Sequence, residues 1–375
     1  MLLICITVGL LVLVCLRIFL LACIGVRSMG DSRLNDALME CRNARLSDAY
    51  NEIAISIIVA DLERESDLIS LLSLDLNRYE VVLLLDFNDS ALVGNILARY
   101  NMLKVDKVPT SELSCMSVRG VYRSRESVYS RLVIVDMNKG GNAQRFSCGA
   151  NIARYEYVMA LEKGCLLTPG AVCSVVRTLL EQNTQIKYCA VGGFRLGELP
   201  RNIFKIVDLS VKMLIVGAGF AKLSLWGENV SVVFDREYLV QAGGYGIDKH
   251  FDYELVKRIE RMNERTKDDA KVMLMPKVML RDRNASGLDI KKCLFSSGFV
   301  FGMLLVLMMF CLLSEYLSLV VLTVVFVYIL SVCVAAMSVY ACSGMLRPKN
   351  SLGVIVAVIF YPFFLIFRLI RLIRY

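Results

Sequence analysis

NKGGNAQRFSCGANIARYEYVMALEKG, residues 138–164, is the stretch that decides the fold. A glycine pair opens it, a helical pattern follows over 141–153, and a short apolar run over 156–161 ends at the acidic Glu162. The loop Lys139-Gly140-Gly141-Asn142 is typical of a nucleotide site, because the backbone N–H groups at the start of a helix point towards a bound anion. A strand-to-helix turn that needs glycine at positive φ explains the same loop equally well.

Strand and helix patterns alternate on both sides of this stretch. Short apolar runs predict strands, and apolar residues at helical spacing predict the helices between them. The alternation predicts an α/β fold with a doubly wound, mostly parallel sheet. The strands are expected at 53–60, 80–86, 131–136, 156–161, 187–194 and 230–234, and the helices at 65–74, 90–99, 141–153, 169–182, 236–242 and 252–265.

Acidic side chains stand where four of the predicted strands end. Ligands bind doubly wound sheets outside the carboxyl ends of the strands, so these positions are where a site is expected. A single acid at a strand end means little, whereas several together with a glycine-rich loop favour a nucleotide site. The positions are Asp61 and Glu63, Asp86 to Asp89, Asp136 to Asn142, and Glu162 to Gly164.

The composition indicates a membrane protein with a globular middle. The 375 residues are 56% hydrophobic and carry a formal net charge of +8. Residues 26–292 have the composition of an ordinary globular domain, and much of the excess positive charge flanks apolar segments outside them. We therefore expect no nucleic-acid partner. The single histidine excludes histidine-based metal sites and triads.

Three apolar regions are expected to lie in a membrane. Residues 1–26 predict an uncleaved transmembrane anchor, because no basic residue precedes a run of spanning length; a cleaved signal peptide is the alternative. Residues 27–49 form a linker, and 293–340 form a transmembrane hairpin. Residues 351–375 form a third C-terminal membrane segment, either spanning or re-entrant and interfacial, because arginines recur on one side of its end.

Basic residues set the predicted sidedness. Arg27, Arg33, Arg42 and Arg45 follow the first apolar segment, and the positive-inside rule places them in the cytoplasm. The central domain, residues 50–285, is then cytoplasmic. The sequence thus predicts an integral protein of the inner or plasma membrane.

Five segments of the central domain, in this order, resemble glycosyltransferase family 2, the processive and lipid-linked branch with a GT-A fold. Any one of these matches is weak, and their order and spacing between membrane segments carry the resemblance. The segments are ISIIVADLERESDL (55–68), YEVVLLLDFNDS (79–90), the 138–164 stretch, FDREYLVQAGGYGIDKHFDYEL (234–255) and VMLMPKVML (272–280).

The resemblance implies a nucleotide-sugar site, a general base and a divalent cation. Asp252 stands at the position of the family's base, which deprotonates the acceptor hydroxyl. The family's D-x-D motif binds Mg²⁺ or Mn²⁺, which bridges the diphosphate of the donor. The residues implied in nucleotide-sugar binding are Glu63, Asp86, Gly140, Gly141, Asn142, Glu162 and Lys163.

Several motifs depart from the family pattern. The triplet aligned with D-x-D is Glu162-Lys163-Gly164, so Glu162 is the only metal ligand implied and the site is incomplete. Leu85 replaces the first acid of the second segment, and Phe251 replaces the acid before Asp252. The Q-x-x-R-W motif of processive synthases is not found, which weighs against a polymer synthase.

Two functions follow from the resemblance and its departures. The first is a membrane-bound glycosyltransferase that moves a sugar from a nucleotide sugar to a lipid or glycan acceptor, in envelope polysaccharide or glycolipid synthesis. Lys163 would then neutralise the departing diphosphate in place of a cation. The alternative is a catalytically inactive pseudo-glycosyltransferase that serves as an accessory or scaffold subunit of another membrane synthase.

Overall fold

The computed structural model describes most of the chain, which divides into two compact units. We call Leu38–Glu198 with Glu228–Ala285 the α/β unit, and Met1–Ala37 with Leu199–Gly227 and Ser286–Tyr375 the helical unit. The described residues are 13, 16–31, 53–88, 93–138, 140–168, 170–180, 187–197, 202–218, 230–246, 251–283, 317–343 and 351–364.

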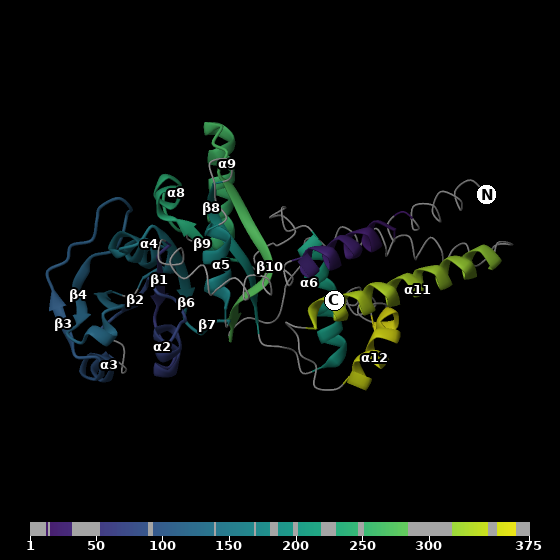
Figure 1. The fold of residues 1–375 in the computed structure, drawn as a ribbon, viewed down its shortest axis with the longest axis horizontal. Helices are drawn as coiled ribbons and strands as arrows, with labels where there is room; N and C mark the ends of the chain where they lie inside the picture. The colour runs from purple at the N-terminus through teal and green to yellow at the C-terminus, as the bar shows by residue number, and fades with distance from the viewer. Residues whose placement is uncertain are drawn as a thin grey trace. The chain divides into compact units, whose positions relative to one another are not determined.

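The α/β unit is built on one sheet of ten described strands, in the order β3-β4-β5-β2-β1-β6-β9-β8-β10-β7 (Figure 1). Its central strands are buried along their whole length, as expected for apolar runs covered on both faces. The strands are β1 (Ile55–Ala60), β2 (Tyr79–Leu85), β3 (Met102–Val105), β4 (Val118–Ser124), β5 (Leu132–Met137), β6 (Tyr157–Glu162), β7 (Cys165–Leu167), β8 (Tyr188–Leu196), β9 (Val230–Asp235) and β10 (Lys271–Asp282).

The sheet is mixed, so the prediction of a mostly parallel sheet holds only in part. Strands β5, β2, β1 and β6 form a parallel block, and β8 pairs in parallel with β10. The other pairings between described strands are antiparallel, because β4, β7 and β9 run against their neighbours. Strand β9 is antiparallel to both β6 and β8, so β8 and β10 point the same way as the parallel block.

The six predicted strands and six predicted helices are all present, with ends shifted by a few residues. Strands β3, β4 and β7 were not predicted, and β10 was noted only as a motif. Strands β3 and β7 are short, and β4 carries half-buried polar residues, so these three lack a continuous apolar run. The helices of the α/β unit are α2 (Glu65–Leu72), α3 (Val93–Arg99), α4 (Asn142–Ile152), α5 (Ala171–Leu180), α8 (Arg236–Gln241) and α9 (Phe251–Thr266), with a short 3-10 turn at Ser127–Tyr129.

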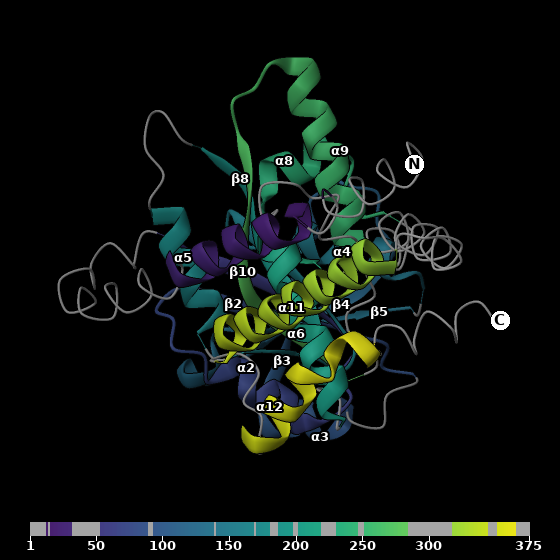
Figure 2. The ribbon, with the colours of Figure 1, turned by 90° about the vertical axis from the view of Figure 1, so that its right-hand side faces the viewer.

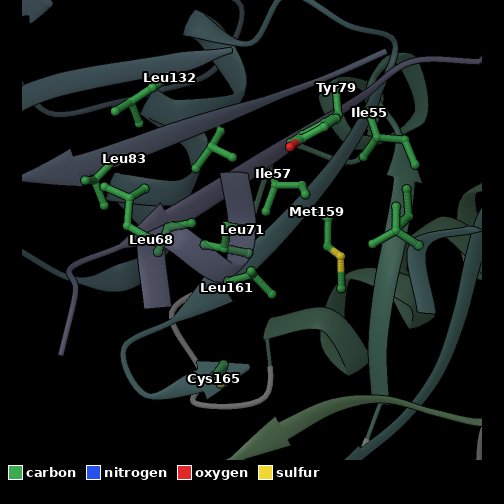
Figure 3. Close-up of a cluster of buried hydrophobic side chains, with 14 of the residues drawn as sticks. Ile55, Ile57, Leu68, Leu71, Tyr79, Leu83, Leu132, Met159, Leu161 and Cys165 are labelled. Atoms are coloured by element: carbon green, nitrogen blue, oxygen red, sulfur yellow. The ribbon is translucent and has the colours of Figure 1, made fainter. Parts of the chain in front are cut away.

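Helices cover both faces of the sheet, as a doubly wound fold requires. On one face, Ile55 and Ile57 of β1 share a buried cluster with Leu68 and Leu71 of α2 (Figure 3). On the other face, α4 lies directly against β1, and a Cβ at Gly149 would collide with the side chain of Ile58. This close approach fixes α4, and with it the loop that precedes it, at the end of the parallel block.

The helical unit consists of a helix over 16–31 together with α6 (Ile203–Ala218), α11 (Leu317–Cys342) and α12 (Ser351–Ile359). Helix α6 packs against both α11 and α12 (Figure 2). It carries a buried acid, Asp208, which pairs with Lys212 at 3.1 Å and accepts a hydrogen bond from the Tyr361 hydroxyl at 3.3 Å. These partners offset the cost of burying the charge.

One helix of the described part, Val324–Cys342, is long and apolar enough to cross a membrane. The described N-terminal helix covers residues 16–31, and residues 1–12, 14 and 15 of the predicted anchor lie outside the described residues. The first arm of the predicted hairpin, near 294–313, also lies outside them. Helix α12 ends at Ile359, one turn before Pro362, and a further helical turn follows over 361–364.

Candidate functional site

The predicted acidic positions gather at one edge of the sheet. Strands β2, β1 and β6 are parallel and in register, with Ala60 paired to both Leu84 and Glu162. Asp61, Asp86 and Glu162 therefore stand together at the carboxyl ends of these strands. Strands β8 and β10 run the same way and add residues from their own carboxyl ends. We call this rim of the α/β unit the carboxyl edge.

The predicted glycine loop opens α4 at this edge. Gly141 is the N-cap of α4 and provides no side-chain cap, so the N–H groups of the first turn stay open to a ligand. Neither Gly140 nor Gly141 has a positive φ, so the alternative of a turn that requires it is wrong. Gly140 instead makes room for the side chain of Met116, and a Cβ at Gly141 would meet nothing within 4 Å. Lys139 lies outside the described residues.

Asp86 forms an ion pair with Arg119. The Nη2 atom of Arg119 lies 2.5 Å from a carboxylate oxygen of Asp86 and 2.5 Å from one of Asp136. Asp136 also accepts a hydrogen bond from the N–H of Phe87 at 3.2 Å, which ties the end of β5 to the end of β2. The two carboxylates and the guanidinium form one half-buried group with a single formal net negative charge.

Asp61, at the end of β1, is held by an arginine from α4. Arg145 is buried and donates to both oxygens of Asp61, at 2.8 and 3.0 Å, and to the carbonyl of Leu84 at 2.7 Å. Asp61 has a φ of 63°, a conformation that a residue with a Cβ rarely adopts. The bidentate pair stabilises this strained backbone next to the glycine loop.

Glu162, the acid of the aligned triplet, is held by Arg195 from β8. Arg195 Nη2 is ion-paired with Glu162 and also lies 2.7 Å from Asp282 at the end of β10. Arg195 Nε donates to the same Asp282 oxygen at 3.2 Å. Glu162 accepts a further hydrogen bond from the side-chain amide of Asn142 at 3.0 Å, which connects this group to the first turn of α4.

Glu63, at the rim of the site, is also paired with an arginine. It is exposed and lies 3.3 Å from Arg283, which also pairs with the buried Asp67 at 3.1 Å. Four arginines, from β4, α4, β8 and the residue after β10, thus bind the acids of the carboxyl edge. None of these four arginines was predicted from the sequence, whereas the acids that they bind were. The sequence signal that could have located them is an arginine in an element that is expected to pack beside a strand with an acidic end.

Lys163 and Gly164 form the tight turn between β6 and β7. Gly164 has a φ of 84°, a value that disfavours any side chain, so the turn itself explains why no aspartate stands there. Lys163 is exposed at the tip of this turn. Any side chain at position 164 would therefore strain this turn.

Asp252, the predicted base, is buried in the first turn of α9 and only 4% exposed. One of its oxygens accepts a hydrogen bond from the N–H of Val232 at 3.2 Å, and the other has no hydrogen-bond partner among the residues described. Burial raises the pKa of Asp252 well above its usual range, and the charge of Arg195 opposes this shift. A raised pKa brings a carboxylate closer to the strength of a base that works near neutral pH. Its role as the base stays a prediction.

The raised pKa predicts a pH-dependent stability. Unfolded aspartate ionises near pH ~3.9, so above about pH 4 the buried Asp252 disfavours the folded state, and this cost grows until the pH reaches the folded-state pKa. In Asp252→Asn the cost is absent. The stability of the variant relative to the wild type should therefore rise as the pH increases above about 4 in urea unfolding. A difference that does not change with pH would contradict the buried, proton-binding state.

The side chains gathered around Glu162 do not fit a divalent cation as they stand. Oxygen or sulfur atoms of Glu162, Cys165 and Asp282 lie within 4.8 Å of one another, which is close enough for a shared ion. Burial raises the pKa of the Cys165 thiol to about 12, so it is not a thiolate at neutral pH. Arg195 binds both carboxylates and so places its positive charge between Glu162 and Asp282.

No family model matches the sequence, and no curated protein matches it. Among solved structures, the fold is similar to the mannosyltransferase PcManGT from Pyrobaculum calidifontis in complex with GDP-mannose and Mn²⁺, with 13% identity, 90% of each chain covered and a TM-score of 0.40. It is also similar to TarS of S. aureus in complex with UDP, with 12% identity, 70% of this chain and 67% of that chain covered, and a TM-score of 0.38. A third is glucosyl-3-phosphoglycerate synthase from Mycobacterium tuberculosis, with 14% identity, 70% and 81% covered, and a TM-score of 0.37.

Proposed function

We propose that the chain is a membrane-bound glycosyltransferase similar to family 2, which moves a sugar from a nucleotide sugar to a lipid or glycan acceptor. The observation that carries this proposal is the carboxyl edge. There, Asn142 in the first turn of α4 donates to Glu162, and Arg119 donates to both Asp86 and Asn138, which lies just before the glycine pair. An uncapped helix start attracts the diphosphate, and flanking carboxylates hydrogen-bond the hydroxyl groups of sugars.

The predicted residues take distinct roles in this proposal. Asn142 and the two glycines face the diphosphate, Asp86 and Glu63 flank the nucleoside side, and Lys163 supplies an exposed positive charge at the β6–β7 turn. Asp252 accepts the proton of the acceptor hydroxyl. The α/β unit works in the cytoplasm at the inner or plasma membrane, where the acceptor is made for envelope polysaccharide or glycolipid.

One observation favours a second candidate, the inactive accessory subunit. The acids of the carboxyl edge are bound by arginines of the same chain, and the predicted base is buried. A domain of this kind still binds a nucleotide sugar, and it scaffolds another synthase without turnover. The two candidates agree on nucleotide binding and differ on sugar transfer.

Nucleotide binding is tested by calorimetric titration of the purified protein in detergent with UDP and with GDP. The wild type should bind one of them, and Asn142→Ala should bind it about tenfold more weakly, because the first turn of α4 loses a polar side chain at the diphosphate. Asn77→Ala is the matched control, since Asn77 is an exposed asparagine before β2, at the opposite edge of the sheet.

Absence of binding to either nucleotide would reject both candidates. An equal loss in Asn142→Ala and Asn77→Ala would reject the proposed location. Release of free nucleotide from UDP- or GDP-sugars in the presence of membrane lipids separates the enzyme from the inactive subunit, because only the enzyme shows turnover.

A further inference from the structure

We propose that the guanidinium of Arg195 occupies the place of a divalent cation, so that the Glu162–Cys165–Asp282 group excludes metal and the site carries a built-in positive charge. The inference deepens the proposed function and rests on it where the diphosphate is concerned. The exclusion of metal is a property of the protein alone and needs no nucleotide.

The geometry places the charge of Arg195 at the centre of the group. Its Nε and Nη2 atoms use one edge of the guanidinium to bind Asp282, at 3.2 and 2.7 Å, and Nη2 bridges to Glu162. The three side chains are between 8% and 19% exposed. Ion pairs that are removed from water in this way are strong and specific in geometry, because little solvent screens them.

A divalent cation would have to displace this arrangement. It would compete with Arg195 for the same two carboxylates, and the guanidinium would remain within the same buried group as a repelling charge. Gly164 supplies no further acid, because it adopts a φ of 84° in the turn after Glu162 and this conformation favours glycine. The group therefore offers two carboxylates already neutralised in part, where a hard cation needs free oxygen ligands.

The same charge stands next to the proposed diphosphate position. Glu162 joins Arg195 to Asn142, in the first turn of α4. Among the described residues, the hydrogen bonds from Arg195 to Glu162 and Asp282 come from Nε and Nη2, and Nη1 takes no part in them. An arginine with one donor edge anchored and further N–H groups remaining is suited to bind a phosphate oxygen, and a fixed positive charge stabilises a departing diphosphate.

The decisive experiment is a Mn²⁺ titration of the full-length protein, followed by electron paramagnetic resonance. The wild type should take up no Mn²⁺ at this group. Arg195→Gln should take up one equivalent, because Glu162 and Asp282 lose their internal cation, whereas Arg195→Lys should take up none. Arg281→Gln is the matched control, because it removes an exposed arginine on the same strand as Asp282 and should leave Mn²⁺ uptake unchanged.

Nucleotide titrations then connect the charge to the ligand. The nucleotide that the wild type binds should bind equally well in EDTA and in Mn²⁺. Arg195→Gln should bind it at least about tenfold more weakly in EDTA and recover most of the loss in Mn²⁺. Circular dichroism melts check that each variant is folded.

Wild-type uptake of one Mn²⁺ that Glu162→Gln abolishes would overturn the proposal. A folded Arg195→Gln that takes up no Mn²⁺ would also overturn it. If Arg195→Gln does not fold, the wild-type and Arg195→Lys titrations decide, and uptake by either one rejects the proposal. If the proposed function fails, neither the wild type nor any variant binds a nucleotide. The Mn²⁺ titrations still test whether Arg195 excludes metal, because they need no nucleotide.

Discussion

Replacement of Arg145 by methionine is expected to lower the free energy of unfolding of the α/β unit by about 3 to 5 kcal/mol. The side chain of Arg145 is 4% exposed and donates to both oxygens of Asp61 and to the carbonyl of Leu84. Its loss would leave a carboxylate and a carbonyl without their buried partner, at a residue that already has a positive φ. Chemical denaturation of the full-length protein in detergent, followed by circular dichroism, measures the loss.

Arg99→Met is the matched control for this variant. Arg99 pairs with Glu65 at 2.7 Å, close to the distance between Arg145 and Asp61, but its side chain is 54% exposed. An exposed ion pair contributes below about 1 kcal/mol, because water and salt screen it. Similar losses in the two variants would show that burial of the Arg145 pair does not stabilise the fold.

Asp252→Asn is expected to reduce sugar transfer by at least about 100-fold, with the affinity for the nucleotide unchanged. The amide keeps the shape of the side chain and the acceptor for the Val232 N–H, but it has no basicity. The loss should therefore lie in turnover, measured as free nucleotide released from the donor. This prediction applies to the active candidate and rests on the proposed role of Asp252 as the base.

Asp235→Asn controls for the substitution itself. Asp235 ends β9, which runs against its neighbours, so it lies at the opposite edge of the sheet from the proposed site. Its side chain caps α8 by accepting from the N–H of Glu237 at 2.9 Å, and asparagine caps helices equally well. Transfer should stay at the wild-type level in this variant. Transfer retained in Asp252→Asn would remove Asp252 from the chemistry.

The central strands could be predicted because burial on both faces leaves an unbroken apolar run. Strand β1 is buried at every position, and its predicted range of 53–60 differs from Ile55–Ala60 by two residues. Strand β4 could not be predicted in the same way, since it is half-buried and carries Arg119 and Arg123. Strand β4 pairs with β5 in the antiparallel direction, so it does not belong to the alternation of strands and helices from which the other strands were predicted.

The acids of the site could be predicted and their partners could not. Acids at strand ends follow from the position of ligands in α/β sheets, whereas their arginines come from elements far away in the sequence. Arg119 lies on the strand that was missed. Arg195 stands just beyond the predicted end of β8 at residue 194, which the structure extends to Leu196. Local sequence patterns carry no information on ion pairs between residues so far apart in the chain, because the order of the strands in the sheet brings these residues together.

The burial of Asp252 also lay beyond the reach of the sequence. The resemblance located the residue, and an acid in the first turn of a helix is usually placed there by the helix dipole. Its contact with the N–H of Val232 arises because α9 packs against β9, an arrangement that depends on the whole unit. The glycine loop is the opposite case, because its place at the start of α4 could be predicted from the local sequence alone.

The central claim is that a nucleotide lies against the carboxyl edge of the α/β unit. Photo-crosslinking with azido analogues of UDP and GDP, followed by peptide mapping, tests it most directly. The account predicts labelled peptides that contain Asp86 or residues 138–146, with the label lost when unmodified nucleotide is added in excess. Labelling confined to residues 199–227 or 286–375, or no label that unmodified nucleotide displaces, would contradict it.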